Sequence, residues 1–539
     1  MEKQSKRFGR ELSRVDAVPA LFLAVAVFLL VFFSLSQGCV LGDDHSAYIL
    51  QGMAIAEGRF DEQTELNYYM HPSYMPDEAQ DGKLVYVWGY SLILALVYKL
   101  VGYDRVAFTS LIWYKLPSVL AMAGTALVLY LFLRRRFGRR LSFFISWMFS
   151  LCGEFYFFVN TMYSDIYFLF FALLTLYVHE IYLDSAGRRR LILGIVTGIL
   201  LWYMYEVRLN GISVLLACAA AHVIQLFARR KKEASVPPAP ELLKELVPYA
   251  LFILLKLLSE AIFAPATSNA SDLEGTNLGI LFGNLLFYFG QIRTFFGSMW
   301  NNILTGLMHL GVDPGSSNAF YYISSSLSAL SLALCLLGMI TDGIKRNFHL
   351  TVYVLGTLAV TSMLFYNQGL RYIFPILPVL VLYAGYGFVR LCTFAGKLLP
   401  RGDKFRKYAA AFTAVLTLVL CLLAAFPQYL SNAALYENGG ISEQSDLTMY
   451  NAFTPEAVEA YNYISENVPE GDVVDFFKPR LLYMNTGRVS VSPMEEIGHS
   501  LDECDWYLVF KLIITVPEPG EDFVPVWENE HFTLYKKEL

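Results

Sequence analysis

Charged residues are scarce in this sequence. Asp, Glu, Lys and Arg together make up 16% of the 539 residues, whereas 56% are hydrophobic and the mean hydropathy is +0.45. Soluble domains average about 25% charged residues, so this composition excludes an ordinary soluble protein. The formal net charge is −6. The basic residues gather in short clusters between apolar runs and form no nucleic-acid-binding motif, so nucleic acid is not an expected partner.

Cysteine is also sparse, and its placement argues against a disulfide-stabilised fold. Five of the seven cysteines lie within apolar runs, Cys39 ends one of these runs, and Cys504 stands alone in the last polar segment. A disulfide framework needs several cysteines in the segments outside a membrane, so none is expected here. The sequence also contains no internal repeat and no long low-complexity linker.

Apolar runs of about 20 residues, the length that crosses a bilayer as a helix, recur along most of the chain. They predict a mainly α, polytopic membrane protein with about eleven spans. The first run follows a basic stretch and precedes no small-residue cleavage site, so we interpret it as a retained anchor. The predicted spans are 18–40, 105–133, 141–159, 166–183, 191–206, 211–228, 246–264, 320–341, 349–366, 371–392 and 408–427.

Lys and Arg in the short connections set the predicted orientation, because they are enriched on the cytoplasmic side of membrane proteins. They place the N-terminus in the cytoplasm and the C-terminal segment outside. The apolar run 85–101 is short, and counting it as a span would put the cluster at 134–140 outside. We therefore expect this run to be a helix lying on the outer face. The basic clusters are at 3–14, 134–140, 188–190, 229–232, 345–346 and 397–407.

Three predicted outer segments are long enough to carry a function: 41–104, 265–319 and 428–539. The first should contain a helix from His45 to Gly58. The third changes character, because a helix capped by Thr454 and several short strands replace the apolar runs. We therefore expect a transmembrane domain at 1–427 and a small extracytoplasmic α/β domain at 428–539. Its expected strands are 473–477, 488–491, 506–510 and 532–535, with a short helix at 481–485.

Acidic residues stand at two outer ends of the predicted spans. Asp43 and Asp44 follow the first span, and Asp165 directly precedes the span at 166–183. A carboxylate at a boundary between polar and apolar surroundings is suited to general base catalysis. The alternative for each is capping of the helix that follows, and Ser164 is a second candidate cap beside Asp165. Taken one by one, these residues leave both alternatives open.

Arg208 and Arg371 lie in short outer turns, opposite the clusters that set the topology, so the positive-inside bias does not explain them. A guanidinium group binds phosphate through two parallel hydrogen bonds, which makes both arginines candidate phosphate ligands. The alternatives are snorkelling to the interface and, for Arg208, pairing with Glu206. His45 and His71 are further candidates for binding substrate or a metal ion, although no spacing here is typical of metal ligands.

The run Gly42-Asp43-Asp44-His45-Ser46-Ala47-Tyr48 resembles the first outer loop of the GT-C membrane glycosyltransferases. This superfamily includes the protein O-mannosyltransferase-like proteins and the lipid A aminoarabinose transferase. The resemblance covers nearly the whole chain. Further matches are Ser164-Asp165 before a span, Arg371-Tyr372 before Pro375, and the segment 476–488 near the C-terminus.

The resemblance implies an enzyme of a bacterial plasma membrane that transfers a sugar from a polyprenyl-phosphate donor to an outer hydroxyl, with inversion. The acceptor would be a glycan, a lipid or a protein. In this superfamily an Asp after the first span is the base. The spacing to Tyr48 favours Asp44 for this role, whereas the preceding Gly42 favours Asp43. Asp165 would orient the acceptor or, with Asp44, hold a divalent cation.

The resemblance also implies a set of substrate-binding residues. Arg371 and Arg208 would stabilise the phosphate of the leaving group. Lys83 stands where some relatives have a Lys-Pro pair, although Leu84 follows it here. The implied substrate-binding residues are Arg371, Arg208, Lys83, His45, Tyr48 and His71.

Two other function classes fit the composition. A transporter or flippase of a lipid-linked sugar would need ionisable residues inside the spans and repeated halves. Glu154 and Lys256 are the candidates for such residues, and no repeat is present. A non-catalytic scaffold for envelope assembly would use the C-terminal domain as a binding module, and it would tolerate the loss of Asp43 and Asp44.

Overall fold

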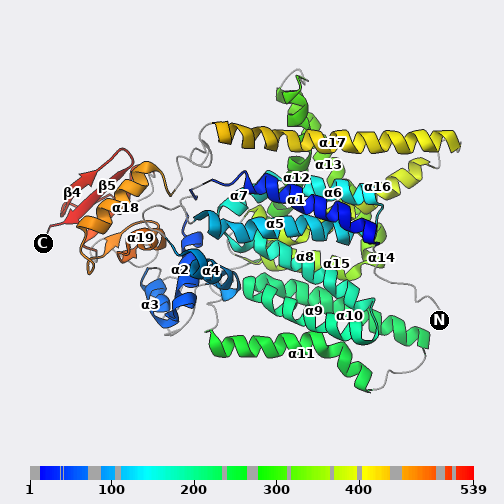
Figure 1. Cartoon of the computed structure of the whole chain (residues 1–539), viewed down its shortest axis with the longest axis horizontal. Helices are drawn as coiled ribbons and strands as arrows, with labels where there is room; N and C mark the ends of the chain where they lie inside the picture. Colours follow the sequence, from blue (N-terminus) through cyan, green and yellow to red (C-terminus); the bar gives the residue numbers. More distant parts are fainter. Residues whose placement is uncertain are drawn as a thin grey trace.

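The computed structural model consists mainly of helices, with one small sheet near the C-terminus (Figure 1). Most helices run along the long axis of the molecule, and the sheet lies beyond one end of them. The mainly α architecture and the C-terminal sheet are thus confirmed. The structure describes residues 13–36, 38–39, 42–70, 86–103, 111–233, 239–263, 277–311, 317–364, 369–396, 403–437, 452–492, 504–512 and 518–538.

Eight helical segments among the described residues are long and apolar enough to cross a membrane. A ninth candidate is the pair α6 (Arg139–Ser150) and α7 (Gly153–Asn160), which meet at a bend of 51°. The eight segments correspond to α1 (Ala17–Phe32), α5 (Leu111–Arg134), α8 (Ser164–Leu183), α9 (Gly187–Val207), α10 (Ile212–Glu233), α13 (Ser317–Gly338), α16 (Leu377–Gly396) and α17 (Asp403–Glu437).

Two of the eleven predicted spans fall on helices that lack the length or the apolar character of the others. One lies on α11 (Ala239–Ile262), which carries Glu245, Lys256 and Glu260. The other lies on α15 (Phe348–Ser362), which has 15 residues. In the described part of the chain, length and composition alone therefore identify eight or nine spans.

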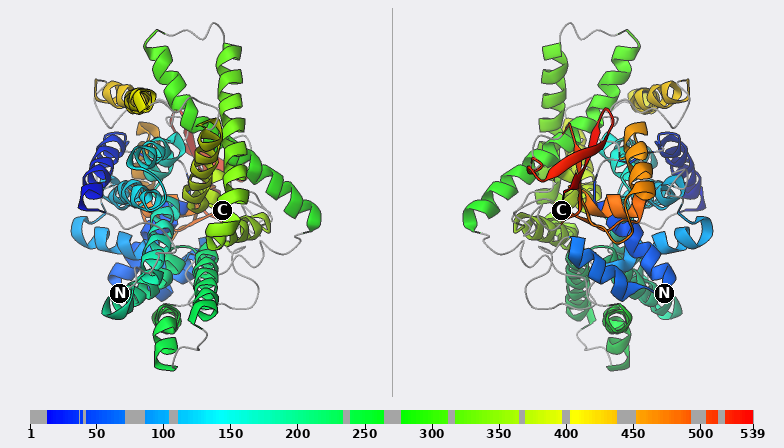
Figure 2. Two further views of the ribbon diagram at one scale, coloured as in Figure 1. Left: turned by 90° about the vertical axis from the view of Figure 1, so that its right-hand side faces the viewer. Right: turned by 90° about the vertical axis from the view of Figure 1, so that its left-hand side faces the viewer.

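The long helices form one bundle. α1, α5, α8, α9 and α11 pack on one another in this order, and α10 packs on α15. α12 (Leu278–His309) packs against α13 and α17, and α12 and α13 project together from one side of the bundle (Figure 2). Outward-facing apolar side chains such as Leu21 on α1 and Leu422 on α17 are exposed, which suits contact with lipid.

Three short helices lie at the end of the bundle nearest the sheet (Figure 1): α2 (Asp44–Glu57), α3 (Phe60–Met70) and α4 (Trp88–Val101). α2 ends at Gly58, as predicted, and the φ of 73° there is a conformation that glycine adopts without strain. α4 has 14 residues, fewer than a span needs. A Cβ atom on Gly89 would lie 2.5 Å from a backbone oxygen at the end of α9, so glycine permits the close packing of α4 there.

The C-terminal sheet has the strand order β2-β1-β3-β5-β4. The strands are β1 (Val474–Asp475), β2 (Ser490–Val491), β3 (Trp506–Phe510), β4 (Phe523–Glu528) and β5 (Phe532–Lys537). β1 pairs in parallel with β2 and β3, whereas β5 pairs antiparallel with β3 and β4. Sequence analysis did not predict β4.

Two helices pack with this sheet. α18 (Pro455–Asn467) begins after Thr454, whose hydroxyl accepts a hydrogen bond from the N–H of Ala457, as the sequence predicts. α19 (Pro479–Thr486) contacts both β2 and α2, so it lies between the sheet and the helical bundle.

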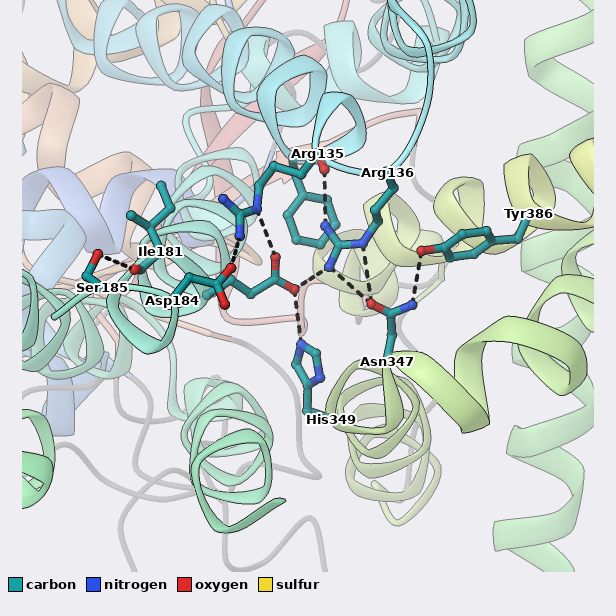
Figure 3. Close-up of polar contacts among 10 residues, drawn as sticks. Arg135, Arg136, Ile181, Asp184, Ser185, Asn347, His349 and Tyr386 are labelled. Carbon is teal, nitrogen blue, oxygen red and sulfur yellow. Dashed lines mark hydrogen bonds and ion pairs between the residues drawn. The ribbon is translucent and has the colours of Figure 1, made fainter. Parts of the chain in front are cut away.

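A buried network of charged side chains lies at the end of the bundle opposite the sheet. Figure 3 shows Arg135 and Arg136, from the turn after α5, directed toward α8 and α15. Both guanidinium groups pair with the Glu180 carboxylate, and His349 Nε2 lies 3.1 Å from it. Each of these side chains is at most 6% exposed. We call Arg135, Arg136, Glu180, Asp184, Asn347 and His349 the Glu180 network.

Candidate functional site

The segment that follows α1 is held by buried polar side chains from two other helices. Lys115, on α5, is fully buried, and its Nζ donates to the carbonyl oxygens of Ser36 (2.7 Å) and Gly38 (2.5 Å). The side-chain oxygen of Asn160, at the end of α7, accepts a hydrogen bond of 2.9 Å from the N–H of Ser36. These bonds fix the backbone that leads to the acidic pair. Lys115 is not among the predicted site residues.

Asp44 is the first residue of α2, and each oxygen of its carboxylate has a partner. The hydroxyl of Tyr86 donates to Asp44 Oδ1 at 3.0 Å, and a guanidinium nitrogen of Arg371 lies 3.2 Å from Asp44 Oδ2. The Asp44 side chain is 36% exposed and that of Arg371 is 18% exposed. The pair therefore joins two predicted site residues and stays open to solvent.

Asp43 points elsewhere, although it is the neighbour of Asp44. Its carboxylate makes no capping bond with α2. Instead, Asp43 Oδ1 accepts from the backbone N–H groups of Arg480 (3.1 Å) and Leu481 (3.4 Å), and Asp43 Oδ2 lies 3.2 Å from the Arg480 guanidinium. The capping alternative is thus wrong for the helix that follows Asp43. Asp43 instead caps α19, which belongs to the C-terminal unit formed by α18, α19 and the sheet.

Asp165 lies in the first turn of α8 and is 2% exposed. Arg208, in the turn after α9, donates to Asp165 Oδ1 at 2.6 Å and to the hydroxyl of Ser164 at 3.3 Å. The alternative pairing of Arg208 with Glu206 does not occur, because Glu206 pairs with Lys256 at 3.1 Å. Asp165 Oδ2 has no hydrogen-bond partner among the described residues.

Aromatic rings connect the two carboxylate–arginine pairs. The guanidinium groups of Arg208 and Arg371 lie 5.0 Å and 5.4 Å from the ring of Tyr372, so one tyrosine contacts both cations. Tyr48 stacks on Tyr86 at a ring distance of 4.5 Å. We call Asp44, Arg371, Asp165 and Arg208, with these three tyrosines, the Asp44 site.

Tyr48 and His45 are more deeply buried than binding residues usually are. Tyr48 is 6% exposed, and its hydroxyl is hydrogen-bonded to that of Ser164 at 2.9 Å, so it links α2 to α8. His45 is fully buried, and neither ring nitrogen has a hydrogen-bond partner among the described residues. Burial lowers the pKa of His45 to about 4, which keeps the imidazole neutral. The predicted residues His71 and Lys83 lie outside the described residues.

Asp44 and Asp165 are the carboxylates predicted to hold a divalent cation. Each gives one oxygen to an arginine, Asp44 gives its other oxygen to Tyr86, and Asp165 Oδ2 has no partner among the described residues. No group of three or more His, Cys, Asp and Glu side chains suited to a metal occurs in the described part of the chain. A divalent cation needs several oxygen ligands, so it stays a prediction here.

The Asp44 site combines an accessible carboxylate with two guanidinium groups at one end of a membrane bundle. An accessible carboxylate can remove a proton from a hydroxyl group. A guanidinium beside it can bind the oxygens of a phosphate, and more strongly where aromatic walls exclude water. This chemistry suits a reaction between a hydroxyl and a phosphate-linked molecule held in the membrane.

No family model matches this sequence, and no curated protein matches it. Solved structures do match its fold. ArnT from Cupriavidus metallidurans bound to undecaprenyl phosphate superposes with a TM-score of 0.56 and 13% identity, over 97% of this chain and 98% of that chain. The apo state of ArnT superposes with a TM-score of 0.52 and 14% identity, over 96% and 98% of the two chains.

The archaeal oligosaccharyltransferase AglB from Archaeoglobus fulgidus, in complex with an inhibitory peptide and a dolichol-phosphate, superposes less well. Its TM-score is 0.49 with 11% identity, over 92% of this chain and 70% of that chain. The likeness to ArnT extends over nearly the full length of both chains. The chain therefore has the fold of ArnT, as the resemblance in its sequence predicts.

Proposed function

We propose that this protein is a membrane glycosyltransferase that moves a sugar from a polyprenyl-phosphate donor to an acceptor hydroxyl. The fold supports this proposal, because ArnT shares it and has been solved with undecaprenyl phosphate bound. The observation that carries the proposal is the pair of Asp44 and Arg371. It brings a partly exposed carboxylate and a phosphate-binding cation together at 3.2 Å.

Accessibility favours Asp44 as the general base. The side chain of Asp44 is 36% exposed, against 11% for Asp43 and 2% for Asp165. An acceptor hydroxyl must come within hydrogen-bond reach of the base. Asp43 is turned toward α19, and Asp165 is covered, so Asp165 acts by orienting Arg208.

The proposed reaction is a single displacement. The acceptor oxygen attacks the anomeric carbon as the bond from that carbon to the phosphate oxygen breaks, and the acceptor proton passes to Asp44. The products are the glycosylated acceptor, with inverted anomeric configuration, and polyprenyl phosphate. The donor phosphate takes over Arg371 from Asp44, which frees the carboxylate and stabilises the charge that develops on the leaving group.

The positions of the basic clusters favour an outward-facing site. Arg134 ends α5 and Arg188 begins α9, and both lie at the end of the bundle away from Asp44. The positive-inside rule would put that end in the cytoplasm. The C-terminal unit 428–539 and the segment 41–104 would then lie outside the plasma membrane, with α11 and α15 completing eleven spans. The acceptor is a glycan, a lipid or a protein.

The test uses purified protein in nanodiscs and a panel of polyprenyl-phosphate sugars, with cell-envelope extract as the source of acceptors. Release of polyprenyl phosphate is measured for the wild type and for Asp44→Asn. We expect turnover of one donor, lost in the variant, and this donor names the sugar. The anomeric configuration of the product, read by NMR, tests inversion.

Asp61→Asn is the control, since Asp61 is an exposed carboxylate on the neighbouring helix α3. It should retain full activity. Tight donor binding without turnover by any preparation would reject the transferase and favour a flippase or a scaffold. Full activity in a folded Asp44→Asn protein would reject Asp44 as the base.

A further inference from the structure

The N-terminus of α19 meets the start of α2 at a junction that the proposed reaction does not use. Its residues are Asp43 on one side, and Arg480 and Leu481 on the other. The Asp43 side chain is 11% exposed and that of Arg480 is 2% exposed, so both charges are buried in the contact. This junction joins the C-terminal unit to the residue next to Asp44.

α19 cannot cap its own N-terminus. The residue at its N-cap position is Lys478, whose ammonium group has no acceptor atom, and the first helical residue, Pro479, has no N–H. The next two backbone N–H groups are those of Arg480 and Leu481. Asp43 accepts a hydrogen bond from both, at 3.1 Å and 3.4 Å, from a position 437 residues earlier than Arg480. A carboxylate from the bundle thus supplies the cap that α19 lacks.

Two other contacts fix the same junction. The hydroxyl of Tyr103, after α4, donates to the side-chain oxygen of Asn485 on α19 at 2.9 Å. The N–H of Ala452, just before α18, donates to the carbonyl oxygen of Cys39 at 2.8 Å. Cys39 belongs to the segment that leads to the acidic pair. The C-terminal unit therefore contacts this segment at Cys39 as well as at Asp43, and it contacts the end of α4.

We propose that Asp43 is a positioning residue, and that the C-terminal unit, docked on it through α19, holds Asp44 in its working orientation. The inference rests on the proposed function, because it assigns Asp43 a role in the same reaction. Consecutive residues share a backbone that the two bonds to α19 fix in place. If they are lost, the first turn of α2 frays, and Asp44 loses its fixed direction toward Arg371 and Tyr86.

The experiment compares Asp43→Ala, Asp43→Asn and the control Tyr103→Phe in the full-length protein. Asparagine keeps an oxygen that accepts the two N–H bonds but lacks the charge. Tyr103→Phe removes a hydrogen bond at the other end of α19 and leaves both bonds of Asp43 in place. Hydrogen–deuterium exchange of a peptide covering 477–487 reports docking of α19, and donor turnover reports kcat and KM separately.

We expect Asp43→Ala to exchange faster in this peptide and to lose at least about tenfold in kcat with little change in the KM for the donor. Asp43→Asn should lie between it and the wild type, and Tyr103→Phe should keep its kcat. Unchanged exchange in Asp43→Ala would overturn the docking role. Faster exchange with an unchanged kcat would overturn the positioning role.

The two proposals fail in different ways. A wild-type protein that turns over no donor contradicts the proposed function, yet exchange in Asp43→Ala still decides whether Asp43 docks the C-terminal unit. If the wild type is active and Asp43→Ala has the same exchange and the same kcat, the proposed transferase function stands. Only the positioning role of Asp43 is then rejected.

Discussion

The two ends of α8 carry acidic residues in contrasting surroundings. Glu180, in the last turn, contacts Arg135, Arg136 and His349, and all four side chains are buried. Asp165, in the first turn, is equally buried and pairs with one cation, Arg208, which also lies over the ring of Tyr372. The two carboxylates are fifteen residues apart, which is about 22 Å along a helix. A carboxylate surrounded by cations holds helices together, whereas one paired with a single cation can orient that cation toward a substrate.

Asp44→Asn should give the largest effect on activity. The amide cannot accept the proton of the acceptor, and loss of a general base lowers kcat by roughly 10²–10⁴-fold. The folded state should be unaffected, because the side chain is partly exposed. Release of polyprenyl phosphate and a thermal melt, measured on the same preparation, separate the two quantities. A matching fall in the melting temperature would place Asp44 with Glu180 as a structural residue.

Glu180→Gln should reverse this pattern. Removing the shared charge leaves the buried Arg136 without its ion-pair partner and leaves Arg135 with Asp184 alone, which costs roughly 3–5 kcal/mol of stability. We expect a large fall in the unfolding midpoint and an unchanged kcat per folded molecule. Glu260→Gln is the matched control, because Glu260 is 42% exposed and pairs with Lys256 on the same helix. That change should cost about 0.5 kcal/mol or less.

Within the Asp44 site, Arg371→Gln should mainly lower activity, whereas Arg208→Gln should also lower stability. Arg371 pairs with the partly exposed Asp44, so its loss should weaken donor use about 10- to 100-fold, with little effect on stability. Arg208 neutralises a covered carboxylate, so its loss should also lower the unfolding midpoint. Arg371→Lys should recover part of the activity, since it keeps the charge without the planar fork. Equal melting curves for the two glutamine variants would contradict this division.

Asp475 on β1 extends the comparison to a carboxylate with no cation. It is fully buried, its oxygens have no hydrogen-bond partner among the described residues, and burial raises its pKa to about 8. A raised folded-state pKa favours folding while the group is protonated, so this stability is complete below about pH 4 and declines as the pH rises through about 8. Asp475→Asn should remove the decline, which thermal melts at about pH 5 and about pH 9 would show. A pH dependence identical to that of the wild type would refute the assignment.

Tyr86→Phe should have the smallest effect. It removes one hydrogen bond to Asp44 and keeps the ring that stacks on Tyr48. A hydrogen bond to a charged group contributes roughly 1.5–3 kcal/mol when buried, and less at this partly exposed site. We expect a loss of about fivefold in kcat, because Arg371 still orients the carboxylate. A loss as large as that of Asp44→Asn would mean that Tyr86 itself takes part in proton transfer.

The sequence predicts the end of the bundle at which the site lies. It does not predict which arginine pairs with which carboxylate. Hydrophobic runs and basic clusters assign each connection to one side, so Asp44, Asp165, Arg208 and Arg371 were expected on the same side. Which arginine meets which carboxylate depends on how the helices rotate and pack. The pairing of Arg208 with Glu206 shows this limit. Arg208 pairs with Asp165 on another helix, although Glu206 is its neighbour in sequence.

Other features escaped prediction for identifiable reasons. Lys115 lies in the apolar run 105–133, and no neighbouring motif indicates that it bonds to the backbone before the acidic pair. β4 contains Pro525, and proline argues against a strand; here β4 is at the edge of the sheet, and its register shifts at Pro525. The direction of Asp43 depends on α19, which no local pattern connects to residue 43.

The bond between Asp43 and Arg480 has a consequence for the order in which the protein is made. The acidic pair leaves the ribosome after the first span, whereas α19 follows 437 residues later than Asp43. Segments fold roughly in the order of their synthesis. The loop that carries Asp44 therefore lacks its contact with α19 through the insertion of every later helix of the bundle. That contact forms only with α19, so a chain interrupted before that point has its membrane helices and lacks the bonds that fix Asp43.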